Sequence, residues 1–289
     1  MSVRNYINSQ TKILGVIGHP IEHSMSPIMH NAAIQDLHLN YIYLALNVPP
    51  NKLQDAIKGI KAFNIKGISV TIPHKERVIP FLDEIDLIAQ KINSINTIKN
   101  VDGFLKGTNT DAEGAKKALI EAGCKLSGKK VILLGAGGAA KAISYSLASE
   151  VEKILIINRT EERAKRLVSE LKTKIGYNIE SKKNTKTTIK KEIDNADILI
   201  NATSVGMFPK TEISPLSKTL LHNKLFVFDL IYNPLETQLL KDSKEIGCRT
   251  LSGLDMLVYQ GALAFEWWTN KKPNIELMKS KIIEYLGVK

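Results

Sequence analysis

The 289-residue sequence has no apolar run long enough to cross a membrane as a helix. The residues from Asn5 to Gln10, which follow Arg4, are mostly polar and lack the apolar stretch of a secretory signal. Cysteine is scarce: Cys124 and Cys248 stand alone, and they form neither a CxxC pair nor a framework for disulfides or metal. We therefore expect a cytoplasmic protein in a reducing compartment, with no membrane association and no metal site.

Acidic residues are outnumbered, with 29 Asp and Glu against 40 Lys and Arg and a net charge of +11. Such an excess is typical of some nucleic-acid-binding proteins. However, seven of the lysines lie between Lys172 and Lys191, a segment with little apolar periodicity and no aromatic residue beyond Tyr177. This pattern is typical of a solvated helix end, a loop and an edge strand. We therefore expect no nucleic-acid partner and attribute the charge to solubility, with some attraction for anionic substrates.

Strand and helix patterns alternate along the chain, which predicts an α/β fold with enough length for two domains. The first part predicts strands at 12–18, 41–48 and 66–72, a helix from Pro27, a helix at 51–63 and a hairpin turning at Asn100–Gly103. A second unit starts with a helix from Asp111 that stops at Gly123. Strands at 131–134, 153–160, 196–204 and 225–234 follow, and two helices close the chain. This order predicts mostly parallel sheets.

The segment GHPIEHSMSPIMHN, from Gly18 to Asn31, places two serines at the start of a predicted helix. Pro27 suits the first helical position, which makes Ser26 the expected N-cap. Ser24 lies on the approach. A helix N-terminus with hydroxyl groups suits a small carboxylate or phosphate, but Ser26 could also serve only as a cap.

The segment GAGGAA at Gly135–Ala140 follows a predicted apolar strand and opens a predicted helix. Its G-x-G-x-x-A spacing allows a tight turn and close approach of the backbone to a pyrophosphate. We predict dinucleotide binding here, with a plain glycine-rich turn as the alternative. The next strand ends in NRTEER rather than in the acidic residue usual for NAD, and Arg159 and Arg163 suit a 2′-phosphate. This predicts NADP, although Glu161 and Glu162 in the first helical turn leave NAD open.

Two charged residues follow predicted strands. Lys75 lies in VTIPHKE just after the strand at 66–72, where open α/β sheets bind ligands, and Asp111 ends GTNTD. Taken alone, Lys75 would be expected to be a charged surface residue, and Asp111 would be expected to be the N-cap of a helix. Together with GHPIEHSMSPIMHN, INT at Ile95–Thr97, GAGGAAK, NRT, NATSVGM, DLIYNP and GLDMLVYQGA in this order, they closely resemble bacterial shikimate dehydrogenases from about Gly15 to Trp268.

This resemblance implies reversible, NADP-dependent reduction of 3-dehydroshikimate to shikimate, a step toward chorismate and aromatic amino acids. It also implies an N-terminal α/β substrate domain over 1–110, a Rossmann domain that binds NADP over 111–252, and C-terminal helices over 253–289 that pack back on the first domain. The protein is expected to bind this small-molecule substrate and to be a monomer or a homodimer.

The resemblance also implies roles for particular residues. Those implied to contact substrate are Ser24 and Ser26 at the carboxylate, Tyr232 near it, and Thr71, Lys75, Asn96, Asp111 and Gln260 at the ring hydroxyls. Those implied to contact the cofactor are Gly135, Ala136, Gly137, Gly138 and Ala139 at the pyrophosphate, Asn158, Arg159, Thr160 and Arg163 at the adenosine phosphate, and Thr203, Ser204, Leu230 and Gly253 at the nicotinamide.

Lys75 is the implied acid/base, paired with Asp111. A free lysine has a pKa of about 10.4, whereas a general base at neutral pH works best with a pKa of about 7–8. The sequence therefore leaves open whether Lys75 transfers the proton or acts as a charged anchor. The histidines at 19, 23, 30 and 74 match no catalytic position, and we expect them to serve packing and supporting hydrogen bonds.

Three other functions fit parts of the sequence. A quinate/shikimate dehydrogenase would use NAD, against which Arg159 and Arg163 argue. A non-catalytic NADP-binding regulator would not need both Lys75 and Asp111. A tRNA-linked reductase would need a nucleophilic cysteine in the N-terminal domain, and the first 123 residues contain none.

Overall fold

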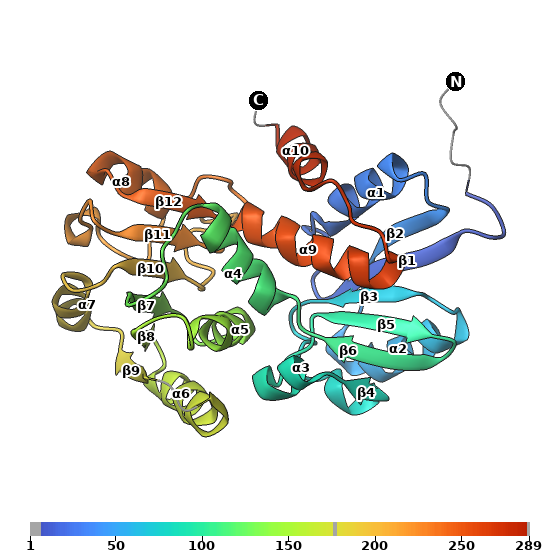
Figure 1. The fold of residues 1–289 in the computed structure, drawn as a ribbon, viewed down its shortest axis with the longest axis horizontal. Coiled ribbons are helices and arrows are strands. Elements are labelled where there is room, and N and C mark those ends of the chain that lie inside the picture. Colours follow the sequence, from blue (N-terminus) through green and yellow to red (C-terminus); the bar gives the residue numbers. More distant parts are fainter. Residues whose placement is uncertain (1–6, 176–177, 288–289) are drawn as a thin grey trace. The chain divides into compact units, whose positions relative to one another are not determined.

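The structure, a computed structural model, describes residues 7–175 and 178–287. They form two compact units (Figure 1). Unit 1 contains the chain up to Thr110 and again from Val258, and unit 2 contains Asp111–Leu257. The second division falls between Leu257 and Val258, rather than at residue 253 where the sequence suggested it. Within the described ranges no helix has both the length and the apolarity needed to cross a membrane.

Unit 1 is built on a six-stranded sheet in the order β2-β1-β3-β5-β6-β4. Strand β1 is parallel to β2 and β3, β4 is parallel to β6, and β5 is antiparallel to β3 and β6. The strands are β1 (Lys12–Gly18), β2 (Tyr41–Asn47), β3 (Gly67–Val70), β4 (Glu84–Ile85), β5 (Thr97–Val101) and β6 (Phe104–Thr108). The helices are α1 (Ser26–Asp36), α2 (Leu53–Ala62), α3 (Leu87–Ile92) and α10 (Ile275–Tyr285). Helix α9 (Gly253–Thr269) belongs to this unit from Val258 onward. Short 3₁₀ turns lie at Pro50–Lys52 and Ile79–Phe81.

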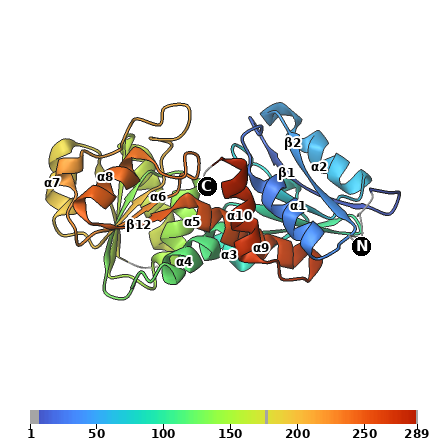
Figure 2. The same ribbon diagram turned by 90° about the horizontal axis from the view of Figure 1, so that it is seen from above.

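The two faces of this sheet are covered by different helices, because side chains alternate along each strand. Ile68 joins the apolar cluster under α2, with Ile57 and Ile60. Its neighbour Gly67 faces the other way, where a Cβ would lie 2.4 Å from the Trp268 ring of α9. The Trp268 Nε1–H donates to the Ile98 carbonyl at 2.9 Å. The absence of a side chain at Gly67 therefore lets α9 cover the middle of the sheet, while α10 packs on α1 (Figure 2).

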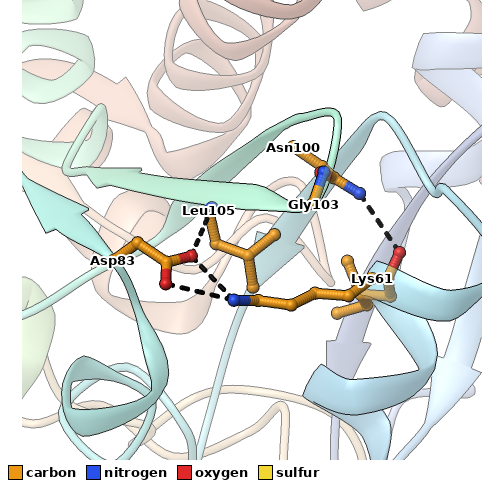
Figure 3. Close-up of polar contacts among 6 residues, drawn as sticks. Lys61, Asp83, Asn100, Gly103 and Leu105 are labelled. Atoms are coloured by element: carbon orange, nitrogen blue, oxygen red, sulfur yellow. Dashed lines mark hydrogen bonds and ion pairs between the residues drawn. The ribbon is translucent and has the colours of Figure 1, made fainter.

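Polar contacts close the β5–β6 hairpin and anchor the segment before β4 (Figure 3). The Asn100 side chain accepts from the Gly103 N–H at 2.7 Å and donates to the Ile60 carbonyl at 3.2 Å. The Asp83 carboxylate accepts from the Leu105 N–H at 2.7 Å and from Lys61 Nζ at 2.8 Å. These bonds tie the hairpin to α2 and hold the pKa of Asp83 below its ordinary value, the Leu105 bond having the larger effect.

Unit 2 is a six-stranded, fully parallel sheet in the order β12-β11-β10-β7-β8-β9. Its strands are β7 (Lys130–Leu134), β8 (Lys153–Asn158), β9 (Ile179–Lys183), β10 (Ile198–Asn201), β11 (Phe226–Asp229) and β12 (Arg249–Ser252). Its helices are α4 (Asp111–Glu121), α5 (Gly138–Leu147), α6 (Glu161–Ile175), α7 (Lys186–Ile193), α8 (Gln238–Ile246) and the start of α9, and a 3₁₀ turn lies at Lys218–Leu220. Helices α4, α5 and α6 lie on one face, and α7 and α8 on the other (Figures 1 and 2).

The expected strand–helix alternation and mostly parallel sheets are confirmed. The lysine-rich segment contains β9 at the sheet edge, followed by α7. The sequence interpretation did not include β4, α3, α7, α8 and β12. The two units supply separate sets of polar groups, which are described in turn below.

Candidate functional site

The N-terminus of α1 is built differently from the sequence prediction. Ser26 is the first helical residue and not the N-cap, which is Met25, and no side chain in the described structure caps the helix. Instead, the Ser24 hydroxyl accepts from the Ser26 N–H at 3.3 Å. Pro27 shifts the helix start because it lacks an N–H and fits the first turn from several positions. Both serines remain at a helix end whose backbone donors and dipole favour an anion.

Beneath this end, α1 is fastened to β2. The Asn31 side chain donates to the Tyr43 carbonyl and accepts from the Tyr43 N–H, both at 2.9 Å. The Tyr43 hydroxyl donates to Ser69 Oγ at 2.8 Å. Burial raises the pKa of Tyr43, and hydrogen bonds with the Ser69 and Ser26 hydroxyls oppose that rise. The position of Ser26 is therefore set by the core below it.

A second polar cluster lies where β3, β5 and α9 meet. Asn96 is buried and its Oδ1 accepts from the Thr110 N–H at 2.7 Å and from the Thr97 hydroxyl at 2.9 Å. Its Nδ2 donates to Thr110 Oγ1 at 2.9 Å and to Gln260 Oε1 at 3.3 Å. The structure thus brings together Asn96 and Gln260, two predicted substrate ligands that are 164 positions apart in the chain.

The segment after β3 carries Thr71 and Lys75. The Thr71 carbonyl accepts from the His74 N–H at 2.9 Å, and the Lys75 carbonyl accepts from the Ile95 N–H at 2.7 Å. The buried His74 ring meets the Val48 carbonyl at 2.7 Å, a supporting hydrogen bond of the kind expected. These bonds fix the backbone at both ends of the segment. Asp111 is buried at the start of α4 in unit 2, so its pairing with Lys75 stays a prediction.

In unit 2 the glycine turn follows β7 as predicted. Gly135 has a φ of +107°, and a Cβ there would lie 2.8 Å from the Ala202 carbonyl oxygen, so a side chain would be strained. Helix α5 starts with Gly137 as N-cap, and among the described residues it has neither a capping side chain nor an acidic residue in its first turn. The space where a Gly137 Cβ would stand is open. Uncapped N–H groups beside open space fit a pyrophosphate.

The end of β8 forms the second part of the cofactor site. The Asn158 side chain donates to the Thr160 carbonyl at 2.8 Å and so shapes the turn into α6. Arg159 and Arg163 are exposed, and neither has an ion-pair partner among the residues that the structure describes. Glu161 binds Lys165 at 2.8 Å, a contact that lowers the pKa of Glu161. Glu161, one of the two acidic residues that left NAD open, is therefore engaged within the helix.

The sequence interpretation missed Lys183. Strand register places it beside Asn158, and the Asn184 N–H donates to the Asn158 carbonyl at 3.3 Å. The charge of Lys183 also reaches Glu161, although Lys165 lowers the pKa of Glu161 more. The preceding residue, Lys182, instead binds Glu192 at 2.6 Å. Only strand pairing reveals that Lys183 lies next to the predicted phosphate contacts, and no local motif marks it.

The residues predicted near the nicotinamide come together at the ends of β10 and β11. Gly253 is packed so closely on the 230–231 backbone that a Cβ would lie 2.0 Å from the Leu230 carbonyl oxygen. The Gly253 N–H donates to the Ile231 carbonyl at 3.1 Å. Thr203 follows β10, and Ser204 is exposed beside it. Tyr232 follows β11, and burial raises the pKa of its hydroxyl. Leu230, Gly253 and Thr203 therefore all lie at the carboxyl ends of strands of this parallel sheet.

Unit 2 is a parallel sheet with an uncapped glycine turn and with arginines at a strand end that lacks an acidic residue, and unit 1 carries a separate polar cluster. These features define an oxidoreductase that uses a dinucleotide on a small polar substrate. Family models match residues 16–98 (shikimate dehydrogenase substrate binding domain), 115–238 (shikimate / quinate 5-dehydrogenase) and 253–283 (shikimate 5′-dehydrogenase C-terminal domain). The chain belongs to the shikimate dehydrogenase family.

Relatives named shikimate dehydrogenase (NADP(+)) match almost end to end. The protein of Methanocaldococcus jannaschii is 48% identical, covering 96% of this chain and 98% of its own. Those of Methanopyrus kandleri and Moorella thermoacetica are 45% and 41% identical, covering 99% and 97% of this chain and 100% and 96% of their own. The expected family is confirmed, but archaeal members are among these relatives, so its bacterial branch is not singled out.

Solved structures agree. A shikimate dehydrogenase in complex with NADP+ has a TM-score of 0.91 and 45% identity, covering 97% of this chain and 98% of that one. The Listeria monocytogenes shikimate 5-dehydrogenase in complex with shikimate and NAD has a TM-score of 0.88 and 38% identity, covering 96% and 98%. A quinate dehydrogenase from Corynebacterium glutamicum in complex with NAD has a TM-score of 0.88 at 27% identity, covering 95% and 99%. The fold is thus shared by enzymes with either cofactor.

Proposed function

We propose that this protein catalyses the reversible, NADPH-dependent reduction of 3-dehydroshikimate to shikimate. The observation that carries the proposal is the meeting of Asn96 and Gln260 at 3.3 Å. Both residues are implied by the family resemblance to hold ring hydroxyls of the substrate, and the fold brings them into one polar cluster although they lie 164 positions apart in the chain. Near-full-length identity to relatives named for this activity supports the proposal.

On the substrate side, Ser24 and Ser26 hold the carboxylate at the N-terminus of α1, with Tyr232 near it. Thr71, Asn96, Asp111 and Gln260 bind the ring hydroxyls and so select a polyhydroxylated ring. Asn96 arrives with its orientation already fixed by Thr97 and Thr110. Such prior orientation lowers the entropy cost of binding a ring in one pose.

NADP supplies the hydride when it is bound. The backbone at Gly135–Ala139 holds its pyrophosphate, and Asn158, Arg159, Thr160 and Arg163 hold the adenosine phosphate. Thr203, Ser204, Leu230 and Gly253 line the nicotinamide end. Lys75 handles the proton at the oxygen of the reacting carbon, and Asp111 orients the Lys75 ammonium group.

The test is a set of four rate assays with the purified protein, pairing shikimate or quinate with NADP+ or NAD+ and following absorbance of the reduced nicotinamide. We expect turnover mainly with shikimate and NADP+. Comparable rates with quinate or with NAD+ would instead assign the protein to the quinate-oxidising type, for which the quinate dehydrogenase of Corynebacterium glutamicum in complex with NAD is the precedent. No turnover in any assay would favour a non-catalytic NADP-binding regulator.

A further inference from the structure

A buried carboxylate lies in unit 2 at the carboxyl ends of the strands, where the predicted nicotinamide residues also lie. Asp229 ends β11 and Asn201 ends β10, and the two residues are directly paired in register. Both are completely buried. The Asn201 Nδ2 donates to Asp229 Oδ1 at 3.0 Å. This bond joins two neighbouring strands at the point where each runs into a loop.

On one side, Asn201 shapes the loop after β10. Its Oδ1 accepts from the Thr203 N–H at 3.1 Å and from the Thr203 hydroxyl at 2.7 Å. The Thr203 hydroxyl oxygen in turn accepts from the Val205 N–H at 3.1 Å. The loop from Ala202 to Val205 is therefore held by the Asn201 side chain at the strand end and by the Thr203 hydroxyl that it orients.

On the other side, Asp229 shapes the loop after β11. Its Oδ1 also accepts from the Ile231 N–H at 3.1 Å, and its Oδ2 accepts from the Thr237 hydroxyl at 2.7 Å. Thr237 caps α8 by accepting from the Leu240 N–H at 3.3 Å. The loop that carries Leu230 and Tyr232 is thus fixed at its start and at its end by one carboxylate.

We propose that Asp229 is a positioning residue for hydride transfer, because it sets the Thr203 loop and the Leu230 loop relative to each other. The inference rests on the proposed function, which places the nicotinamide end of NADP beside these loops. A carboxylate suits this task because it is an acceptor only, and both of its oxygens are used by three donors. An Asn side chain at this position would place an NH₂ group opposite one of these three donors. That donor would then lose its hydrogen bond and stay buried without a partner.

The experiment compares Asp229→Asn with Asp197→Asn. Asp197 precedes β10 at the opposite, amino end of the strands of the same sheet, where it accepts from Lys129 Nζ at 2.7 Å and from the Lys130 N–H at 2.9 Å. For each folded variant, kcat is measured with shikimate and NADP+, and Kd is measured for adenosine 2′,5′-bisphosphate, which carries only the phosphate end of the cofactor. Thermal unfolding is recorded in parallel.

We expect Asp229→Asn to lower kcat by about 10- to 100-fold while Kd for the bisphosphate changes less than about twofold, since small displacements of reacting groups cost this much. Asp197→Asn should lower the melting temperature without lowering kcat. If Asp229→Asn fails to fold, Thr237→Val takes its place, with a smaller loss of kcat that Thr237→Ser restores.

An unchanged kcat in both the Asp229 and Thr237 variants would overturn the inference and leave these residues a structural role only. An equal loss of kcat in Asp197→Asn, or a loss of bisphosphate binding in Asp229→Asn, would also overturn it, because the effect would then be a general weakening of the unit. Wild-type protein that turns over no shikimate would overturn the proposed function itself, and this inference with it.

Discussion

The imidazole ring of His30 stacks on the phenol ring of Tyr43, with centroids 4.2 Å apart and planes 13° from parallel. His30 is completely buried, and neither ring nitrogen has a hydrogen-bond partner among the described residues. Phe265 and Trp268 of α9 complete the aromatic surroundings. An imidazole here behaves as an apolar aromatic ring, and it lies four positions after Ser26 on α1.

This burial makes the stability of the protein sensitive to acid. Burial lowers the pKa of His30 to about 3, so the ring stays neutral in the folded state while the unfolded chain takes up a proton below pH 6.5. The free energy of unfolding therefore falls as pH decreases from 6.5 toward 3, by up to about 1.4 kcal/mol per pH unit.

Replacing His30 by Phe keeps the stack and removes this loss. In urea unfolding we expect the advantage of His30→Phe over wild type to grow by about 2–3 kcal/mol between pH 7 and pH 4.5. An advantage independent of pH would show that His30 does not carry the acid sensitivity.

Gly253 should tolerate no side chain, because a Cβ would collide with the backbone at Leu230 and Ile231, which cannot rotate away. We expect Gly253→Ala to lower the free energy of unfolding by about 1–3 kcal/mol and to reduce kcat through the displaced Leu230 loop. The matched control is Gly59→Ala in α2, where the nearest atoms to a Cβ are 3.9 Å away. That change should stabilise the protein by about 0.5–1 kcal/mol through helix propensity. Denaturation and steady-state rates on both variants check this, and equal behaviour of the two would contradict it.

Lys183 should contribute to the choice of cofactor. Replacing it with Gln removes a positive charge beside Asn158, and we expect KM for NADP+ to rise about two- to fivefold with KM for NAD+ unchanged. The effect should shrink at high ionic strength, because exposed charges are screened. Lys182→Gln is the control, because this substitution removes the same charge from the neighbouring position, where Lys182 is already paired with Glu192. A similar rise in both variants would mean that only net charge matters.

Lys75 should be required for turnover and dispensable for cofactor binding. We expect Lys75→Ala to lower kcat by about 10²- to 10⁴-fold, the usual contribution of a positioned acid or base, with Kd for NADP+ unchanged. Lys91→Ala, at an exposed lysine of α3 in the same unit, serves as the control. Near-normal turnover in Lys75→Ala would remove Lys75 from the mechanism, and solvent or Asp111 would then have to supply the proton.

The sequence was most informative where structure depends on neighbouring residues. Apolar runs such as Val131–Leu134 and the glycines after them specify a buried strand and a turn with only local information. Helix starts were less certain, as Ser26 shows, because Pro27 is compatible with more than one first turn. Strand β4 has two residues and helix α3 has six, which is too short for a periodic pattern to be recognised. Helix α8 is amphipathic, with Leu239 and Leu240 buried, and its pattern was overlooked in the sequence.

The supporting residues of the site were not predictable in the same way. Tyr43, Asp229 and Lys183 owe their positions to strand register, which brings together residues that are far apart in the chain. Predicted ligands such as Asn96 and Gln260 came from motif order, but the side chains that orient them did not. Hydrogen-bond partners in a sheet are set by pairing, and a single sequence contains no direct record of it.

The cover that Trp268 provides over Gly67 also sets an order of events during synthesis on the ribosome. The strands of unit 1 emerge first, but the indole that covers Gly67 and pairs with the Ile98 carbonyl is translated only after all of unit 2. Unit 2 is continuous in the chain and can complete its core while the earlier strands still wait for α9. A nascent chain released early, before residue 258, would carry an uncovered sheet face and be recognised as unfinished by chaperones and proteases.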